Sequence, residues 1–264
     1  MNYRSDFHVH TNLSRCAPGD TTLQSQIDGL CDFPDGLDTL GISNHLWDSS
    51  IPGASNWYKG QDVPHVLLLR EEMKSVNTRK KRILLGAEVE MTSDCDVCIT
   101  RENARLFDYL LITVSHFHMK GLVISPEITD ADTVRELLIK RFIAACKWDS
   151  PVKCGICHPF YPMSFYHIEN EILSKITDAE YEKCFNEAKK GNKSIEIHAS
   201  ILRPVDPDEN GIARQYARML RIARECGCSF HIGSDVHKPN RETGILLRRA
   251  AEKCGIDEER LTEF

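Results

Sequence analysis

Short apolar runs alternate with longer segments of helical periodicity along the chain. The run Leu110–Val114 (LLITV) is almost entirely apolar, a pattern typical of a strand buried on both faces of a parallel sheet. By this pattern we expect seven strands, at Asp6–His10, Thr39–Asn44, Arg82–Glu90, Tyr109–Ser115, Lys153–His158, Ser194–His198 and Ser229–Asp235. Helical spacing is clearest in the second half, at Asp132–Trp148, Thr177–Lys190, Ile212–Cys226 and Gly244–Cys254.

The alternation of strands and helices predicts an α/β fold with a parallel sheet. Residues 1–264, with a mass of 30.0 kDa, are enough for one domain, and we see no internal repeat or linker. Polar residues at the ends of the strands favour a TIM-like barrel with its site at the strand C-terminal ends. Two loops interrupt the alternation, Leu46–Val66 and Ile201–Gly211, and each is either a lid over the barrel mouth or an inert surface loop.

Composition limits the range of functions. A net charge of -6 and a pI near 6.0 give no basic field for a nucleic-acid backbone, so we expect no nucleic-acid partner. The N-terminal segment has no apolar signal run, no stretch approaches the length of a membrane span, and the mean hydropathy is -0.35. We therefore expect a cytoplasmic protein that makes no contact with a membrane.

The 11 cysteines are not expected to form disulfides in a cytoplasmic protein. Cys154 and Cys157 lie three residues apart on a predicted strand, so they point to opposite faces and are poorly placed to share a metal ion. Cys95 and Cys98 fall in a predicted loop and remain open as a metal or redox candidate. Most of the others lie in helical patterns, where cysteine acts as a small apolar side chain.

Side chains with metal-binding groups lie at the ends of six predicted strands. Imidazole and carboxylate groups are ligands of zinc and related ions, and a set this large can hold more than one ion. A hydrogen-bonded core histidine would explain any one of these residues, but it would not explain them all. The eight residues are His8, His10, His45, Glu88, His116, His158, Asp235 and His237.

The spacing of these residues supports a shared site. His8 and His10 are separated by one residue in HVH, so on a strand both imidazoles project to the same side. Asp235 and His237 have the same spacing in SDVH. Glu88 ends an apolar strand and carries two oxygens, so it is placed to bridge two ions.

The ordered motifs HVHTNLS, SNH, GAEVE, TVSH, CHP and GSDVH resemble those of the PHP (polymerase and histidinol phosphatase) family, from Asp6 to about Gly244. The resemblance implies a distorted seven-stranded (β/α)7 barrel with three divalent metal ions, which are zinc, manganese or iron. It implies a first ion held by His8, His10, Glu88 and Asp235. It implies a second ion held by Glu88, His116 and His158, and a third held in part by His45 and His237.

The chain departs from the family pattern at Cys16. Six residues after the second histidine of HxH, the family usually places Asp or His as a further ligand of the third ion. A thiolate is a good zinc ligand, so Cys16 is a candidate for this role. Burial as a small apolar side chain is the alternative.

Three further residues are candidates for contact with a substrate or for proton transfer. His198 ends the sixth predicted strand at the same mouth, where it would protonate a leaving group; a structural role is the alternative. His118 lies two residues beyond His116 and is a lesser candidate for the same duty. Arg203 follows the sixth strand and would hold a phosphate group with two hydrogen bonds, unless it is an ordinary surface arginine.

These observations favour metal-dependent hydrolysis of a small phosphomonoester, with histidinol phosphate the candidate that the resemblance suggests. A metal-bridging hydroxide would attack phosphorus, and Asp235 would orient it. An amidohydrolase-type enzyme acting on an amide or lactone also opens with HxH, but it typically bridges its metals with a modified lysine, and the fourth strand has no lysine. A non-catalytic, metal-stabilised scaffold would leave so full a ligand set unexplained. We therefore expect a phosphatase whose partner is a small phosphorylated metabolite.

Overall fold

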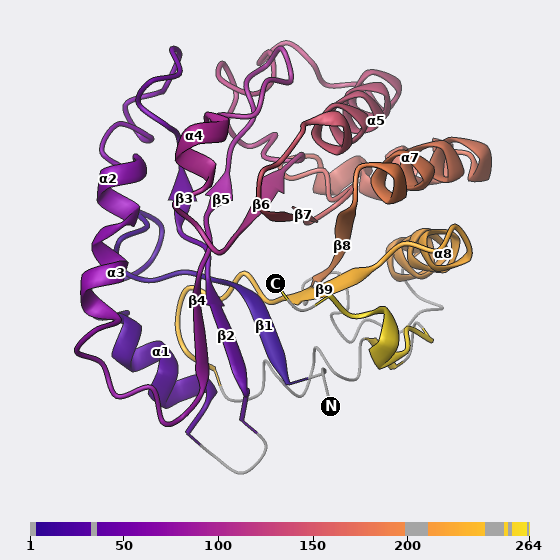
Figure 1. The fold of residues 1–264 in the computed structure, drawn as a ribbon. Coiled ribbons are helices and arrows are strands. Elements are labelled where there is room, and N and C mark those ends of the chain that lie inside the picture. The colour runs from indigo at the N-terminus through magenta and orange to yellow at the C-terminus, as the bar shows by residue number, and fades with distance from the viewer. Residues whose placement is uncertain (1–3, 33–35, 199–210, 241–250, 253–254, 263) are drawn as a thin grey trace.

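Parallel strands form two sheets inside the protein, and helices cover them on the outside (Figure 1). The structure, a computed structural model, describes residues 4–32, 36–198, 211–240, 251–252, 255–262 and 264. The smaller sheet has the order β1-β2-β4, and the larger has the order β3-β5-β6-β7-β8-β9. The strands are β1 (Ser5–Val9), β2 (Thr39–Ile42), β3 (His45–Leu46), β4 (Arg82–Leu85), β5 (Glu88–Val89), β6 (Tyr109–Thr113), β7 (Lys153–Cys157), β8 (Lys193–His198) and β9 (Phe230–Gly233).

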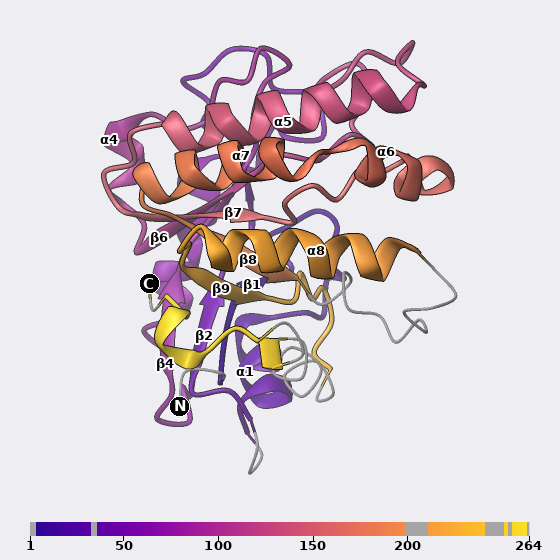
Figure 2. The ribbon, with the colours of Figure 1, turned by 90° about the vertical axis from the view of Figure 1, so that its right-hand side faces the viewer.

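The helices lie outside the sheets, and α5, α7 and α8 lie side by side (Figure 2). The predicted start of α7 is confirmed, because Thr177 and Glu180 form a capping box and Gly191 follows the last turn. The helices are α1 (Leu23–Leu30), α2 (Val63–Val66), α3 (Leu68–Glu72), α4 (Arg101–Ala104), α5 (Ala131–Lys147), α6 (Glu169–Lys175), α7 (Asp178–Lys190) and α8 (Gly211–Glu225), with 3₁₀ turns η1 (Tyr166–Ile168) and η3 (Glu258–Arg260).

The α/β class and the parallel pairing are confirmed, but one predicted strand is wrong as a single strand. Arg82–Glu90 becomes β4 followed by β5, whereas Thr39–Asn44 shortens to β2, and β3 begins just beyond it at His45. The break in Arg82–Glu90 falls at Gly86, where the ring of Tyr109 lies against the backbone; a Cβ on Gly86 would be 2.3 Å from the Tyr109 Cζ atom. The chain stays paired across the break, since the Gly86 amide donates to the Ile42 carbonyl at 2.7 Å.

The predicted seven-stranded barrel is not confirmed, because the described strands form two sheets rather than one closed sheet. The first and last strands nevertheless meet at their C-terminal ends. Val9 and Val236 form an isolated parallel bridge, and the Asp235 amide donates to the His8 carbonyl at 2.7 Å. This contact brings side chains from both ends of the sequence to one place.

Strand β1 contains an irregularity next to the predicted site. Its Asp6 pairs with Leu40 and its Val9 with Ile42, so three steps on β1 match two steps on β2. An extra residue of this kind bends a strand and redirects its side chains. As a result, the neighbouring residues Phe7 and His8 both make contacts inside the fold, Phe7 with Tyr109 and His8 with the carboxylates described below.

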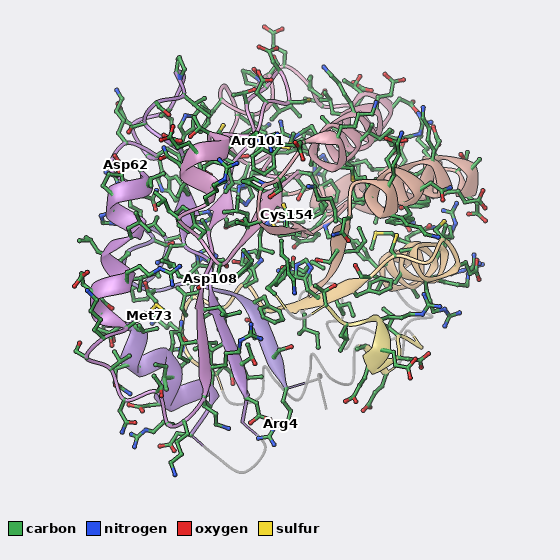
Figure 3. The ribbon with its side chains drawn as sticks, viewed as in Figure 1. Arg4, Asp62, Met73, Arg101, Asp108 and Cys154 are labelled. Carbon is green, nitrogen blue, oxygen red and sulfur yellow. The ribbon has the colours of Figure 1, made fainter. Side chains whose placement is uncertain are left out.

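The segments around the sheets are anchored by capping and ion pairs. Asp108, labelled in Figure 3, accepts hydrogen bonds from the Leu85 amide at 2.7 Å and from Arg70 at 2.9 Å, which ties α3 to the sheet.

The predicted loop Leu46–Val66 is mostly irregular between β3 and α2. The predicted loop Ile201–Gly211 and helix Gly244–Cys254 lie largely outside the described residues. Within the described ranges, no helix is long and apolar enough to cross a membrane.

Candidate metal centre

Glu88 lies at the centre of the predicted site, and its Oε2 atom faces histidines from two strands. Oε2 is 2.7 Å from Nδ1 of His45 and 3.5 Å from Nε2 of both His8 and His10. Asp235 approaches the same two imidazoles from the end of β9, with its Oδ1 atom 2.9 Å from His10 Nε2 and 3.5 Å from His8 Nε2. The structure therefore brings these five predicted residues together.

The other oxygen of Glu88 faces a second group. Its Oε1 atom is 2.8 Å from Nε2 of His158 and 3.2 Å from Nε2 of His116. Cys157 lies beside them, with its Sγ atom 3.8 Å from the same oxygen. Sequence reasoning missed Cys157 as a possible ligand because it considered this cysteine only as a partner for Cys154. Its position immediately before His158, at the end of a strand, was the available signal.

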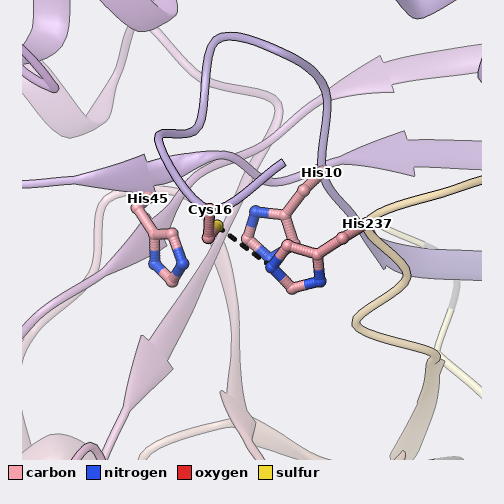
Figure 4. Close-up of side chains that lie close together, drawn as sticks. All are labelled: His10, Cys16, His45 and His237. Atoms are coloured by element: carbon pink, nitrogen blue, oxygen red, sulfur yellow. Dashed lines mark hydrogen bonds between the residues drawn. The ribbon is translucent and has the colours of Figure 1, made fainter. Parts of the chain in front are cut away.

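A third group forms at the solvent edge of the site, and it contains Cys16 (Figure 4). The Sγ atom of Cys16 is 3.0 Å from Nε2 of His237, and His45 and His10 offer nitrogens in the same group, all within 4.8 Å of one another. The rings of His10 and His237 stack with centroids 4.4 Å apart. Cys16 is an exposed residue, so the alternative that it is simply buried is wrong.

Most of these histidines have their second ring nitrogen held by a hydrogen bond. Such a bond fixes the tautomer and aims the opposite nitrogen at the centre of the site, as the outer residues of metal sites commonly do. In each case the bonded nitrogen is Nδ1: His8 with Glu196 at 2.7 Å, His10 with Ser14 at 3.0 Å, His116 with Glu90 at 2.8 Å, His158 with Ser115 at 2.8 Å, and His237 with the Asp235 carbonyl at 2.8 Å.

Sequence reasoning also missed the two buried carboxylates of this outer layer. Glu90 accepts from the Tyr58 hydroxyl at 2.8 Å and lies 3.5 Å from the buried guanidinium of Arg141. Glu196 binds His8 and accepts from the His158 amide at 2.5 Å. Glu90 follows Glu88 by two positions, and Glu196 precedes His198 by two. On the predicted strands, each carboxylate therefore lies on the same face as its neighbouring site residue. That spacing was the signal that could have identified them.

Buried polar atoms at the centre fit a group of metal ions. His8 Nε2, His10 Nε2, His45 Nδ1 and Glu88 Oε2 are buried, and none has a hydrogen-bond partner of good geometry within the described part of the chain. Such atoms are rare in folded proteins because burying them without a partner is costly. Nitrogen, carboxylate and thiolate donors together suit zinc and neighbouring divalent metals.

The electrostatics of the centre follow from burial opposed by pairing. Burial lowers the pKa of His10 to about 3, so this imidazole is neutral and able to donate its lone pair. Burial opposes the charge on His45 as well, but the Glu88 carboxylate overrides it and raises the pKa to about 10. The surrounding imidazoles hold the pKa of Glu88 well below its usual range despite burial. A cation entering the centre would therefore displace protons that the histidines hold for Glu88.

Two of the site residues have a strained backbone. His158 has a φ of 30° and Asp235 a φ of 56°, in the left-handed region that residues with a side chain seldom adopt. Such strain persists only where the surroundings impose it, and it concentrates at functional sites. As the chain leaves β7 and β9, the side chain of His158 faces Glu88 and that of Asp235 faces His8 and His10.

Two of the three remaining predicted residues, His198 and His118, lie around the mouth of the site. The Nε2 atom of His198 is 3.7 Å from Oδ2 of Asp235. The His118 residue reaches the surface, and its ring meets that of His116 edge-on at 5.0 Å. Partial desolvation of the ring and the neighbouring His116 lower the pKa of His118 to about 4. A cavity of about 150 Å³ opens here, and the segments that follow β1, β3, β6, β7 and β9 line it. Arg203 lies outside the described residues.

Comparison with known proteins gives a structural likeness without a sequence match. The sequence matches no family model and no curated protein. The fold is similar to the crystal structure of histidinol phosphate phosphatase (HisK) from Lactococcus lactis subsp. lactis Il1403, which is complexed with zinc, L-histidinol and phosphate. The TM-score is 0.65 at 16% identity, over 97% of this chain and 95% of that chain. A Xaa-Pro dipeptidase and an uncharacterised protein are more distant, with TM-scores of 0.39 and 0.37 at 12% identity. The chain therefore shares its α/β fold with a zinc-containing phosphatase.

Proposed function

We propose that this protein is a metal-dependent hydrolase that acts on a small phosphomonoester. The observation that carries the proposal is the position of Glu88, whose two oxygens face two groups of imidazoles across a buried centre. A purely structural histidine cluster would be expected to satisfy its buried nitrogens with hydrogen bonds. The likeness of the fold to a phosphatase that contains zinc supports the proposal.

We propose that the centre holds three divalent ions in a distorted barrel, as the sequence resemblance implies. Zinc is favoured at the outer position because the thiolate of Cys16 joins imidazoles there. The proposed sets are His8, His10, Glu88 and Asp235 for the first ion, Glu88, His116 and His158 for the second, and Cys16, His45 and His237 for the third.

Ions bound in these positions would supply Lewis acidity toward a phosphoryl group and an acidified water as the nucleophile. Asp235 lies between His10 and His198, so its carboxylate is placed to orient that water. His198 stands beside it and is placed to carry a proton to the leaving alkoxide. His118, at the cavity mouth, is proposed to contact the substrate.

The cavity restricts the size and character of the substrate. Among its described lining residues, Trp57, Met119 and Met163 are apolar, and they line it together with the histidines. A volume of about 150 Å³ is small for a binding pocket, which favours a compact metabolite. Histidinol phosphate is the first compound to test, because HisK is complexed with L-histidinol and phosphate.

The experiment compares phosphate with amide chemistry on one metal-reconstituted preparation. The protein is loaded separately with zinc, manganese and iron, and assayed on an aryl phosphate, histidinol phosphate, an aryl amide and a lactone. We expect turnover of the phosphates only. Turnover of the amide or lactone without the phosphates would instead assign the protein to the amidohydrolase type, and no turnover at full metal loading would favour a scaffold.

The role of His198 has its own test. His198→Ala should slow the hydrolysis of an alkyl phosphate much more than that of an aryl phosphate, because only the poor leaving group needs a proton. Equal losses on both substrates would remove His198 from the acid role and leave it a positioning role beside Asp235.

A further inference from the structure

A second cavity lies at the other end of the strands from the candidate metal centre. Its volume is about 740 Å³, and its walls come from residues 146–153, 187 and 190–193. It opens where β7 and β8 begin, beside the C-terminal ends of α5 and α7. Strand β7 runs from this cavity at Lys153 to the metal centre at His158, so the two sites are separated by the length of a strand.

Lys193 is the unusual residue of this cavity. It is the first residue of β8, it is only 3% exposed, and its ammonium lies 5.8 Å from the centre of the half-buried Trp148 ring. Within the described part of the chain it forms no ion pair with a carboxylate. A buried ammonium is costly unless an anion accompanies it, and the face of one indole offsets only part of that cost.

Other charges in the cavity are also mainly positive. Lys147, Lys153 and Lys190 line it together with Lys193, against the acidic Asp149 and Glu187. Asp149 is already paired with Arg101. An anion entering the cavity would therefore meet more cations than carboxylates.

Compensation of helix dipoles explains only part of this pattern. Lys147 and Lys190 lie in the last turns of α5 and α7, where a cation is favourable beside the free carbonyl groups. Lys153 and Lys193 begin strands, so this explanation does not apply to them. The buried ammonium beside an open cavity still requires its own explanation.

We propose that this cavity binds a small aromatic anion, whose carboxylate or phosphate group pairs with the ammonium of Lys193 while its ring packs beside Trp148. The volume is in the range of pockets that hold small molecules. An anionic group would compensate the buried charge, and a planar ring would cover the exposed part of the indole. The proposal is independent of the metal centre and of the function proposed for it.

The test uses the tryptophans as reporters of position. The chain has three, of which Trp57 lines the metal-centre cavity, Trp47 is buried, and Trp148 lines this cavity. The indole N–H signals of ¹⁵N-labelled whole protein are assigned with Trp148→Phe and followed during titration with benzoate, phenylphosphonate and neutral benzamide. Phenylphosphonate has no ester bond, so a phosphatase cannot consume it.

We expect benzoate or phenylphosphonate to move the Trp148 signal saturably while Trp57 stays in place, and the stronger of the two identifies the preferred anionic group. Benzamide should have little effect. The proposal is overturned if neither anion moves Trp148 saturably, or if benzamide moves it equally. The titrations themselves use only the wild-type protein, and Trp148→Phe serves only to assign the signal.

Lys193→Gln should weaken the binding of the anion about tenfold, because one charge-assisted contact is worth roughly that much. Lys193→Arg should retain most of the affinity. Lys189→Gln is the matched control, since Lys189 lies in the last turn of α7 but outside the cavity lining, and it should bind like wild type. Unchanged affinity in Lys193→Gln, with native circular dichroism, would contradict the proposal.

Discussion

Two neighbouring regions inside the protein share the same strands, but one is packed with apolar side chains and the other with buried polar groups. One is an apolar cluster made of Phe7, Leu84, Tyr109, Leu111, Cys157 and Phe264, in which Cys157 also borders Glu88 of the centre. The other is the candidate metal centre, which begins at the very next residues, His8 after Phe7 and His158 after Cys157. The apolar cluster is complete in itself, because its rings fill the space between them. The centre contains buried nitrogens and oxygens that face one another without hydrogen bonds of good geometry among the described residues, and bound metal ions would satisfy them.

The difference predicts that the two regions fail differently when changed. A substitution in the apolar cluster should lower the free energy of unfolding but leave the metal content and activity of each folded molecule unchanged. A substitution in the centre should cost metal and activity while the fold survives.

Glu88→Gln should give the largest loss. It keeps the volume and removes the charge that faces both imidazole groups, so ions would bind poorly. We expect metal content to fall well below the proposed three ions and phosphatase activity to fall by about three orders of magnitude or more. Elemental analysis, kinetics and circular dichroism measure the three quantities. Full metal content in a folded Glu88→Gln variant would remove Glu88 from its bridging role.

Phe7→Ala tests the apolar cluster and should reduce stability rather than metal binding. Phe7 packs edge-on against Tyr109 and Phe264 and is 1% exposed. Its truncation should cost about 3–5 kcal/mol in the free energy of unfolding, measured with urea on metal-free protein. Metal content per folded molecule should stay near the wild-type value. Loss of metal at unchanged stability would show that the two regions are not separable.

The α/β class and the gathering of the strand-end residues could be predicted from the sequence, because a parallel sheet places all its C-terminal ends at one edge. His8, His116 and Asp235 are examples, since each lies at the end of a predicted strand. The break between β4 and β5 could not be predicted, since it falls where the ring of Tyr109 packs against Gly86.

The buried carboxylates that hold the histidines could not be predicted either. Glu90 and Glu196 look like ordinary polar positions in a strand, and only the fold shows which histidine each one holds. The irregularity in β1 is likewise set by pairing with β2, which is about thirty residues away in the chain and carries no local signal.

Asp6→Asn should change the pH dependence of stability at the boundary between the two regions. Burial raises the pKa of Asp6 from an ordinary 3.8 to about 6. The folded state therefore keeps a proton that the unfolded state releases, so this contribution is present below pH 3.8 and is lost as the pH rises through about 6. The wild type should lose about 3 kcal/mol over that window relative to Asp6→Asn. The free energy of unfolding is measured with urea at several pH values. An equal pH dependence of this free energy in both proteins would contradict the raised pKa of Asp6.

Glu90→Gln should have a smaller effect on the centre, together with a loss of stability because the buried Arg141 guanidinium loses its carboxylate partner. Glu90 holds Nδ1 of His116 and does not face the proposed ions itself. Loss of its charge should reduce metal affinity or activity about 10- to 100-fold, the usual effect of an outer-layer residue. Glu102→Gln, in the exposed first turn of α4, is the control and should behave like wild type. Equal behaviour of the two variants would make Glu90 a structural residue only.

Cys16→Asp should have the smallest effect and is the finest test of the centre. The exchange replaces sulfur by oxygen next to His237, so the outer ion should stay bound while its preference moves from zinc toward manganese. Cys16→Ala should lose that ion alone. Competition between the two metals, followed by elemental analysis, measures the preference, and full occupancy in Cys16→Ala would show that the sulfur is not a ligand.

The meeting of β1 and β9 has a consequence for the order in which the protein matures. His8 and His10 are made early in synthesis, but Asp235 and His237 come more than 200 residues later. Their contact is therefore among those most distant in sequence, and such contacts form slowly and late. A nascent chain would expose imidazoles and the Cys16 thiol without the carboxylate that completes their surroundings. Metal capture should accordingly follow the docking of the last strand, and a chain interrupted before β9 should be handled by the cell as an apoprotein.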